Sequence, residues 1–172
     1  MTSAKDSIGQ FLGYGGQDHR QRSLDQALAW DDNMLETTHD YVQWWFPLSD
    51  PSAFSSDAPV ASGAEFEELA GDPRVRAGQE RAMHRMLRFY GLNLDATGTV
   101  SKFDEWSRFS LNWASTPTHN DLRITRMLKS LCLLGHRTHA EAIFSALEEI
   151  IEEERGERGQ VPLSFWRSAL LG

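Results

Sequence analysis

Two separate stretches of the chain carry the polar and aromatic side chains that could bind a ligand or move a proton. In the first stretch, residues 36–48, a histidine stands next to a carboxylate and close to two adjacent tryptophans. An imidazole beside a carboxylate can transfer a proton, and aromatic rings offer apolar contact to a ligand. The candidate site residues of this stretch are His39, Asp40, Tyr41, Gln43 and Trp44.

The adjacent tryptophans constrain how this stretch can pack. Neighbouring helical residues point about 100° apart, so Trp44 and Trp45 cannot share one face of a helix. One ring is expected in the core, and the other against a second helix, the following loop or a binding surface. Core packing of both rings is the simpler alternative.

The second stretch, residues 118–130, reads THNDLRITRMLKS and is expected to begin a helix. Free backbone amides and the positive end of the helix dipole attract an anion there, and an arginine one turn along can clamp a carboxylate or phosphate. The alternative is a structural network in which these arginines pair with acidic residues of the same chain. The candidate ligand-binding residues are His119, Asn120, Arg123 and Arg126.

Metal and nucleophile patterns in the chain are incomplete. Glu36 and His39 have the spacing used by carboxylate-bridged metal bundles, but no second such pair exists. The single cysteine, Cys132, lies on the apolar side of an expected helix, where its thiol stays protonated. Phosphate-binding and dinucleotide-binding loops are also missing. We therefore expect no catalytic residue, no metal and no cofactor.

The charge balance argues against general binding to nucleic acid, since the formal net charge is -8. A basic row, Arg74, Arg81, Arg85 and Arg88 with His84, is most simply the solvated face of one helix. Nucleic-acid binding through this row together with residues 123–129 is kept as the alternative function.

Apolar periodicity and turn residues predict an all-α protein without strands. The expected helices cover residues 23–30, 31–46, 62–70, 73–90, 103–113, 121–134, 138–154 and 164–171. Three prolines make residues 47–61 a long loop, and glycines make residues 1–22 an irregular arm.

A chain of 172 residues has the size of one domain. We expect a single-domain, orthogonal or irregular bundle of about seven helices, with an N-terminal arm at 1–22 and a helical domain at 23–172. Without a signal peptide or an apolar run of ~18 residues, the expected location is cytoplasmic, with no membrane insertion.

Three stretches together resemble the conserved domain of the opioid growth factor receptor family. They are LDQALAWDDNMLETTHDYVQWWFPLSDPSAFSSDAPV at 24–60, RMLRFYGL at 85–92 and HNDLRITRMLKSLCLLG at 119–135. The resemblance implies an all-helical domain, which in the animal receptor is associated with binding the enkephalin pentapeptide and restraining cell growth. In its compact form this chain resembles the stand-alone microbial members, and the resemblance assigns no catalytic residue.

These observations favour a non-enzymatic module that binds a peptide, a protein or a small anionic ligand where the two stretches converge. An enzyme using His39 or His119 as an acid–base group and a scaffold with exposed aromatic residues are further alternatives.

Overall fold

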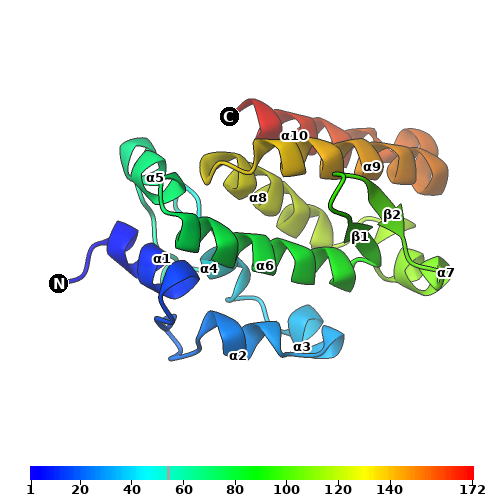
Figure 1. The fold of residues 1–172 in the computed structure, drawn as a ribbon. Coiled ribbons are helices and arrows are strands. Elements are labelled where there is room, and N and C mark those ends of the chain that lie inside the picture. Colours follow the sequence, from blue (N-terminus) through cyan, green and yellow to red (C-terminus); the bar gives the residue numbers. More distant parts are fainter. Residues whose placement is uncertain (54) are drawn as a thin grey trace. The chain divides into compact units, whose positions relative to one another are not determined.

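The computed structural model describes residues 1–53 and 55–172 and is mostly helical (Figure 1). The all-α class that the sequence predicts is confirmed, with the addition of one short antiparallel hairpin. The expected loop at 47–61 includes Phe54, which lies outside the described residues. The chain forms two compact units: unit 1 contains residues 1–85 and 133–136, and unit 2 contains residues 86–132 and 137–172.

Unit 1 is built from short helices and the N-terminal part of a long one. They are α1 (Ala4–Gly13), α2 (Leu24–Leu28), α3 (Asp32–Thr37), α4 (Val42–Trp45), α5 (Gly63–Ala70) and α6 (Pro73–Phe89). The expected capping box at Ser62 and Glu65 is present, and so is the start of α6 at Pro73. A second capping box, at Ser23 and Gln26, begins α2.

The single helix expected at 31–46 is wrong, because the chain forms α3 and α4 with a break between them. Thr38 ends α3 in an extended conformation, with φ -99° and ψ 133°. Beyond the break, the Tyr41 hydroxyl donates a hydrogen bond of 2.9 Å to the carbonyl of Leu35. The buried tyrosine therefore folds the chain back on α3 where helical periodicity alone would have continued it.

The irregular conformation expected for the N-terminal arm is also wrong, because residues 4–13 form α1. The Ser3 side chain accepts a hydrogen bond from the Asp6 backbone amide and caps this helix. Ile8, Phe11 and Leu12 are buried and share one face of the helix. This three-residue stripe outweighed the glycines that favoured a loop.

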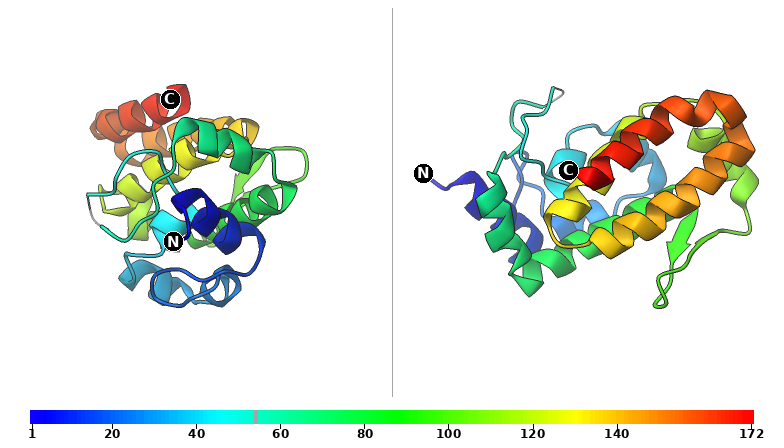
Figure 2. Two further views of the ribbon diagram at one scale, coloured as in Figure 1. Left: turned by 90° about the vertical axis from the view of Figure 1, so that its left-hand side faces the viewer. Right: turned by 90° about the horizontal axis from the view of Figure 1, so that it is seen from above.

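Unit 2 begins with the hairpin and continues as helices. The strands are β1 (Leu92–Leu94) and β2 (Val100–Lys102), with Asn93 opposite Ser101. The helical elements are α7 (Trp106–Phe109), the π-helix η1 (Ser110–Ala114), α8 (Asn120–Leu133), α9 (Arg137–Arg155), the 3-10 turn η2 (Gly156–Gly159) and α10 (Gln160–Leu171). Helices α9 and α10 run side by side in opposite directions (Figure 2).

The hairpin was not expected from the sequence, because strands of three residues are too short to show an alternating pattern. Its turn is held by the Asp95 carboxylate, which accepts hydrogen bonds from the backbone amides of Thr97 and Thr99. Within the described ranges, no helix is both long and apolar enough to cross a lipid bilayer.

Candidate functional site

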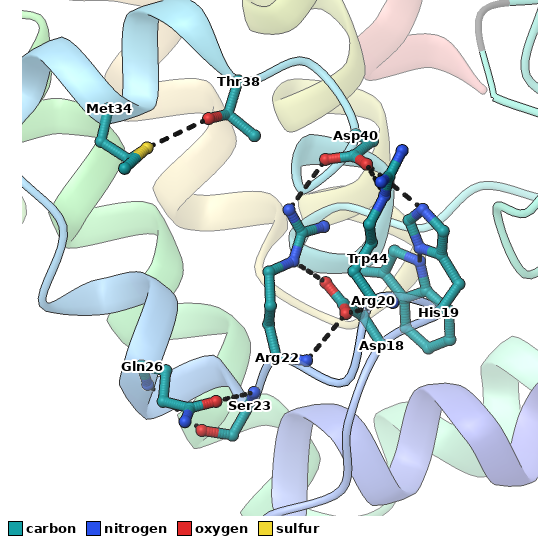
Figure 3. Close-up of polar contacts among 10 residues, drawn as sticks. All are labelled: Asp18, His19, Arg20, Arg22, Ser23, Gln26, Met34, Thr38, Asp40 and Trp44. Atoms are coloured by element: carbon teal, nitrogen blue, oxygen red, sulfur yellow. Dashed lines mark hydrogen bonds and ion pairs between the residues drawn. The ribbon is translucent and has the colours of Figure 1, made fainter.

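A tight turn at residues 18–22 organises the polar cluster of unit 1 (Figure 3). The Asp18 carboxylate accepts backbone hydrogen bonds from Arg20 at 2.8 Å and Arg22 at 3.0 Å. It also accepts the Nε–H of Arg22 at 2.7 Å, and its side chain is only 2% exposed. The turn thus points the side chains of His19, Arg20 and Arg22 toward the first candidate stretch.

The carboxylate of Asp40 contacts these side chains, as Figure 3 shows. Its carboxylate accepts hydrogen bonds from Arg20 Nε and Arg22 Nη1, both at 2.9 Å, and His19 Nε2 lies at 3.3 Å. Burial by itself raises the pKa of this carboxyl, but the hydrogen bond and charge of Arg22, aided by His19 and Arg20, lower it overall. Asp40 is therefore an ionised anchor at neutral pH.

His19 links Asp40 to Trp44. The indole Nε1 of Trp44 donates a hydrogen bond of 3.1 Å to His19 Nδ1, and the two rings are stacked 11° from parallel. Because an indole N–H only donates, Nδ1 carries no proton and the ring proton is on Nε2, facing Asp40. Trp44 is only 6% exposed, so its ring packs inside unit 1.

The other residues of the first stretch have different environments. Tyr41 is buried and its ring meets that of Trp45 edge to face, with centroids 4.9 Å apart. Gln43 is buried, and its Oε1 accepts no hydrogen bond from the residues that the structure describes. His39 lies at the surface. Both tryptophans are buried, as in the simpler alternative.

The second candidate stretch lies at the start of α8 in unit 2. His119 is exposed, whereas Asn120 is buried and its backbone amide donates to Thr118 Oγ1 at 3.1 Å. Arg123 is 7% exposed, with Nη1 3.5 Å from the side-chain oxygen of Asn120. Burial lowers the pKa of Arg126 to about 10, which leaves it charged at neutral pH. Two poorly solvated cations therefore occupy the first turns of α8.

Arg155, at the end of α9, completes this region and was missed by sequence reasoning. Its guanidinium binds both carboxylate oxygens of Asp121 at 2.9 Å, and its side chain is 1% exposed. It also donates to the backbone carbonyls of Trp113, Ala114 and Thr116. The only hint in the sequence is a cation ending a run of glutamates, a pattern also typical of a solvated helix end.

The basic row on α6 is used largely for internal contacts of unit 1. Arg81 pairs with Asp25 at 2.5 Å, and Arg85 binds Asp32 and the Trp30 carbonyl, both at 2.8 Å. The Arg74 guanidinium lies over the Tyr14 ring, 5.2 Å from its centroid. These pairs reduce the positive charge on which nucleic-acid binding would depend.

The structure thus groups the candidate residues within each unit. Asp40 and Trp44 share His19 in unit 1, and Asn120 contacts Arg123 in unit 2. The convergence of the two stretches stays a prediction. In the part of the chain that the structure describes, no three His, Cys, Asp or Glu side chains come together in a way that could hold a metal ion.

The fold and the cluster define a mostly helical protein in which internal polar contacts hold Asp40 and Trp44 of the first candidate stretch. Residues 18–170 match the family described as the opioid growth factor receptor (OGFr) conserved region. The chain belongs to this family, and the match includes both candidate stretches and Arg155.

Relatives named for this receptor are 35–42% identical to this chain over the aligned residues. The human opioid growth factor receptor is 42% identical over 112 residues, which cover 62% of this chain and 16% of the receptor. The rat receptor is 38% identical over 133 residues, covering 73% and 22%. Mouse opioid growth factor receptor-like protein 1 is 35% identical over 109 residues, covering 63% and 23%. The matched part is thus less than a quarter of each relative, and no solved structure matches significantly.

Proposed function

We propose that this chain is a non-enzymatic binding module that recognises a peptide, a protein or a small anionic ligand through the start of α8. The observation that carries the proposal is the pair of poorly solvated arginines, Arg123 and Arg126, on the first turns of that helix. Shielding from water strengthens the charge-assisted hydrogen bonds that such guanidinium groups form with a carboxylate or phosphate.

The charge of Asp121 does not oppose an anion at this helix start. Asp121 is the acidic residue of the first turn, and Arg155 neutralises it with two hydrogen bonds. The helix dipole and the arginines then determine the sign of the local potential. A carboxylate or phosphate is the complementary ligand group.

The names of the relatives support recognition of a partner. Those relatives are called receptors, a word for proteins that bind a ligand, and this chain shares their conserved region. The identity of the ligand is not carried over, because the chain matches only a small part of each receptor.

The first stretch has two roles in this proposal. Asp40 and Trp44 hold the turn at 18–22, whereas His39 lies at the surface and is the group offered to a ligand. A spin label at residue 39, in a variant lacking Cys132, tests convergence with α8. Broadening of the amide signals of residues 119–123 is expected, and unaffected signals would contradict it.

Titration with phosphate, citrate and peptides bearing a free carboxylate, followed by calorimetry and NMR, tests the anion site. Arg123→Ala should weaken binding about 10- to 150-fold, since a hydrogen bond to a charged group contributes roughly 1.5–3 kcal/mol. Arg158→Ala, which removes an exposed arginine of η2, is the charge-matched control. Arg123→Lys keeps the charge but loses the planar fork, and should give an intermediate affinity. Equal affinity for all four proteins would refute the anion clamp.

A further inference from the structure

Helix α1 packs against α4 and α5 of unit 1 (Figure 1). One face of α1 is buried in the groove that its neighbours form. Ile8, Phe11 and Leu12, spaced i, i+3 and i+4, are 0, 2 and 4% exposed. The Phe11 ring meets the Trp44 ring of α4 edge to face, with centroids 5.4 Å apart. A Cβ on Gly9 would touch the Leu69 side chain of α5 at 3.4 Å. The groove is therefore lined by α4, α5 and the first turns of α6.

Gly78 shows that α6 is shaped to receive a helix. A glycine inside a helix costs about 1 kcal/mol relative to alanine. At residue 78, however, a Cβ would stand only 1.8 Å from the carbonyl oxygen of Leu12. Gly13 makes the matching approach from α1, since its Cβ would lie 3.0 Å from the Val75 backbone nitrogen. At each of these two approaches a glycine of one helix faces the backbone of the other helix, Gly78 facing Leu12 and Gly13 facing Val75.

The polar contacts around the groove hold α1 in register but add little affinity. Lys5 Nζ lies 2.6 Å from Glu68, and the Tyr14 hydroxyl donates to Asp72 at 2.8 Å. Glu68 is 63% exposed, and exposed ion pairs of this kind contribute at most about 1 kcal/mol. A cavity of about 230 Å³ remains beside α1, lined in part by Asp6, Leu69 and Val75.

The family match covers the helices that line the groove but does not cover α1. The family match begins at residue 18, so the groove helices lie inside it and α1 lies outside. Residues 14–17 connect α1 to the matched region, and Gly15 among them has a positive φ of 72°. The helices that line the groove thus lie within the matched family region, whereas the helix that fills it lies before that region.

We propose that this groove is a docking site for an amphipathic partner helix, and that α1 occupies it in cis. The fitting partner carries large apolar residues at i, i+3 and i+4 and a basic residue one turn earlier, where Lys5 now faces Glu68. The carboxylates of Glu68 and Asp72 favour such a basic helix. Because α1 is tethered, its high effective concentration restricts access to partners. This surface is separate from the anion site proposed above.

The test uses the full chain and a fluorescent peptide of residues 1–17 as the probe. In a release variant, Phe11→Asp with Leu12→Asp, the native α1 can no longer bury its face. The peptide should bind this variant at least tenfold more tightly than the wild type, whose groove is filled. A peptide carrying the same two substitutions is the control and should not bind.

A second substitution tests the groove itself. Gly78→Ala, added to the release variant, should abolish peptide binding while the far-UV circular dichroism stays helical, since alanine favours α6. Unchanged binding after this substitution, or no binding to the release variant, would overturn the proposal. If the wild type were a dimer and the release variant a monomer, the groove would be occupied by a second copy of this chain. That result would also overturn the proposal.

Discussion

At the scale of single residues, the carboxylate of Asp18 stabilises the turn that places His19, Arg20 and Arg22 near Asp40. It binds two backbone amides of its own turn and the Arg22 guanidinium, and it is almost completely buried. The turn also holds Gln21 at a positive φ of 61°, a conformation that costs an L-residue about 1 kcal/mol. Asp18 therefore stabilises both a strained backbone and the placement of Arg22.

Replacing Asp18 with asparagine should destabilise the protein by roughly 2–3 kcal/mol. The amide lacks the charge that pairs with Arg22 and has only one oxygen for three donors, and hydrogen bonds to charged groups contribute about this much. Urea unfolding measures the change. Asp104→Asn, at an exposed position, is the matched control and should shift stability by less than about 0.5 kcal/mol.

Acidification should weaken the fold through Asp40. Its folded pKa lies below the ordinary value, so the ionised form stabilises the native state above the unfolded pKa of about 4. This contribution is lost as the pH falls through the lower, folded pKa. Urea midpoints measured from about pH 6 to pH 3 should fall less steeply for Asp40→Asn than for the wild type. Parallel curves would show that Asp40 contributes no such stability.

The sequence pointed to Asp40 and Trp44 but not to their partners. The contacts that hold them join residues 18 to 25 positions apart, across α2, α3 and the breaks around them. No periodic pattern relates such positions, and a Gly-containing segment with scattered charges is typical of a loop. His19, Arg20 and Arg22 could therefore be found only from the structure.

At the scale of elements, Arg155 joins three helical segments of unit 2. It ends α9, binds carbonyls at the end of η1 and pairs with Asp121 in the first turn of α8. Trp166 of α10 adds a hydrogen bond of 3.0 Å to the Asp121 carbonyl. Elements that the sequence predicts separately are thus positioned by one side chain.

Substituting Arg155 with methionine should cost about 3–5 kcal/mol, because it leaves the Asp121 carboxylate and several carbonyls without their donor. Thermal and urea unfolding quantify the loss. The double variant that also carries Asp121→Asn should be more stable than the sum of the single changes indicates, since it removes the unpaired charge. Strict additivity would mean that the two side chains do not interact in solution.

Element boundaries were predicted well where the sequence has strong caps and terminators. They were predicted poorly where buried tertiary contacts determine the beginning or end of a helix. Pro73 begins α6, and Gly135, with a positive φ of 84°, follows α8 as expected. The break before α4 depends on burial of Tyr41, and α1 depends on a groove formed by later residues. Such tertiary effects override local propensity and leave no local pattern.

At the scale of the whole molecule, the two units share continuous helices. Residues 73–85 of α6 belong to unit 1 and residues 86–89 to unit 2, and α8 likewise contributes Leu133 to unit 1. Unfolding one unit alone would have to break a helix in its interior, where each turn stabilises the next. Cooperative unfolding of the two units therefore tests the expectation of a single domain.

We expect both units to unfold in one cooperative transition. Each contains three tryptophans: Trp30, Trp44 and Trp45 in unit 1, and Trp106, Trp113 and Trp166 in unit 2. In protein labelled with 5-fluorotryptophan, all six native fluorine signals should therefore lose intensity at the same urea concentration. The Asp18→Asn substitution in unit 1 should shift all six midpoints equally. If only the three signals of unit 1 moved, the units would be independent folding domains despite the helices that run through both.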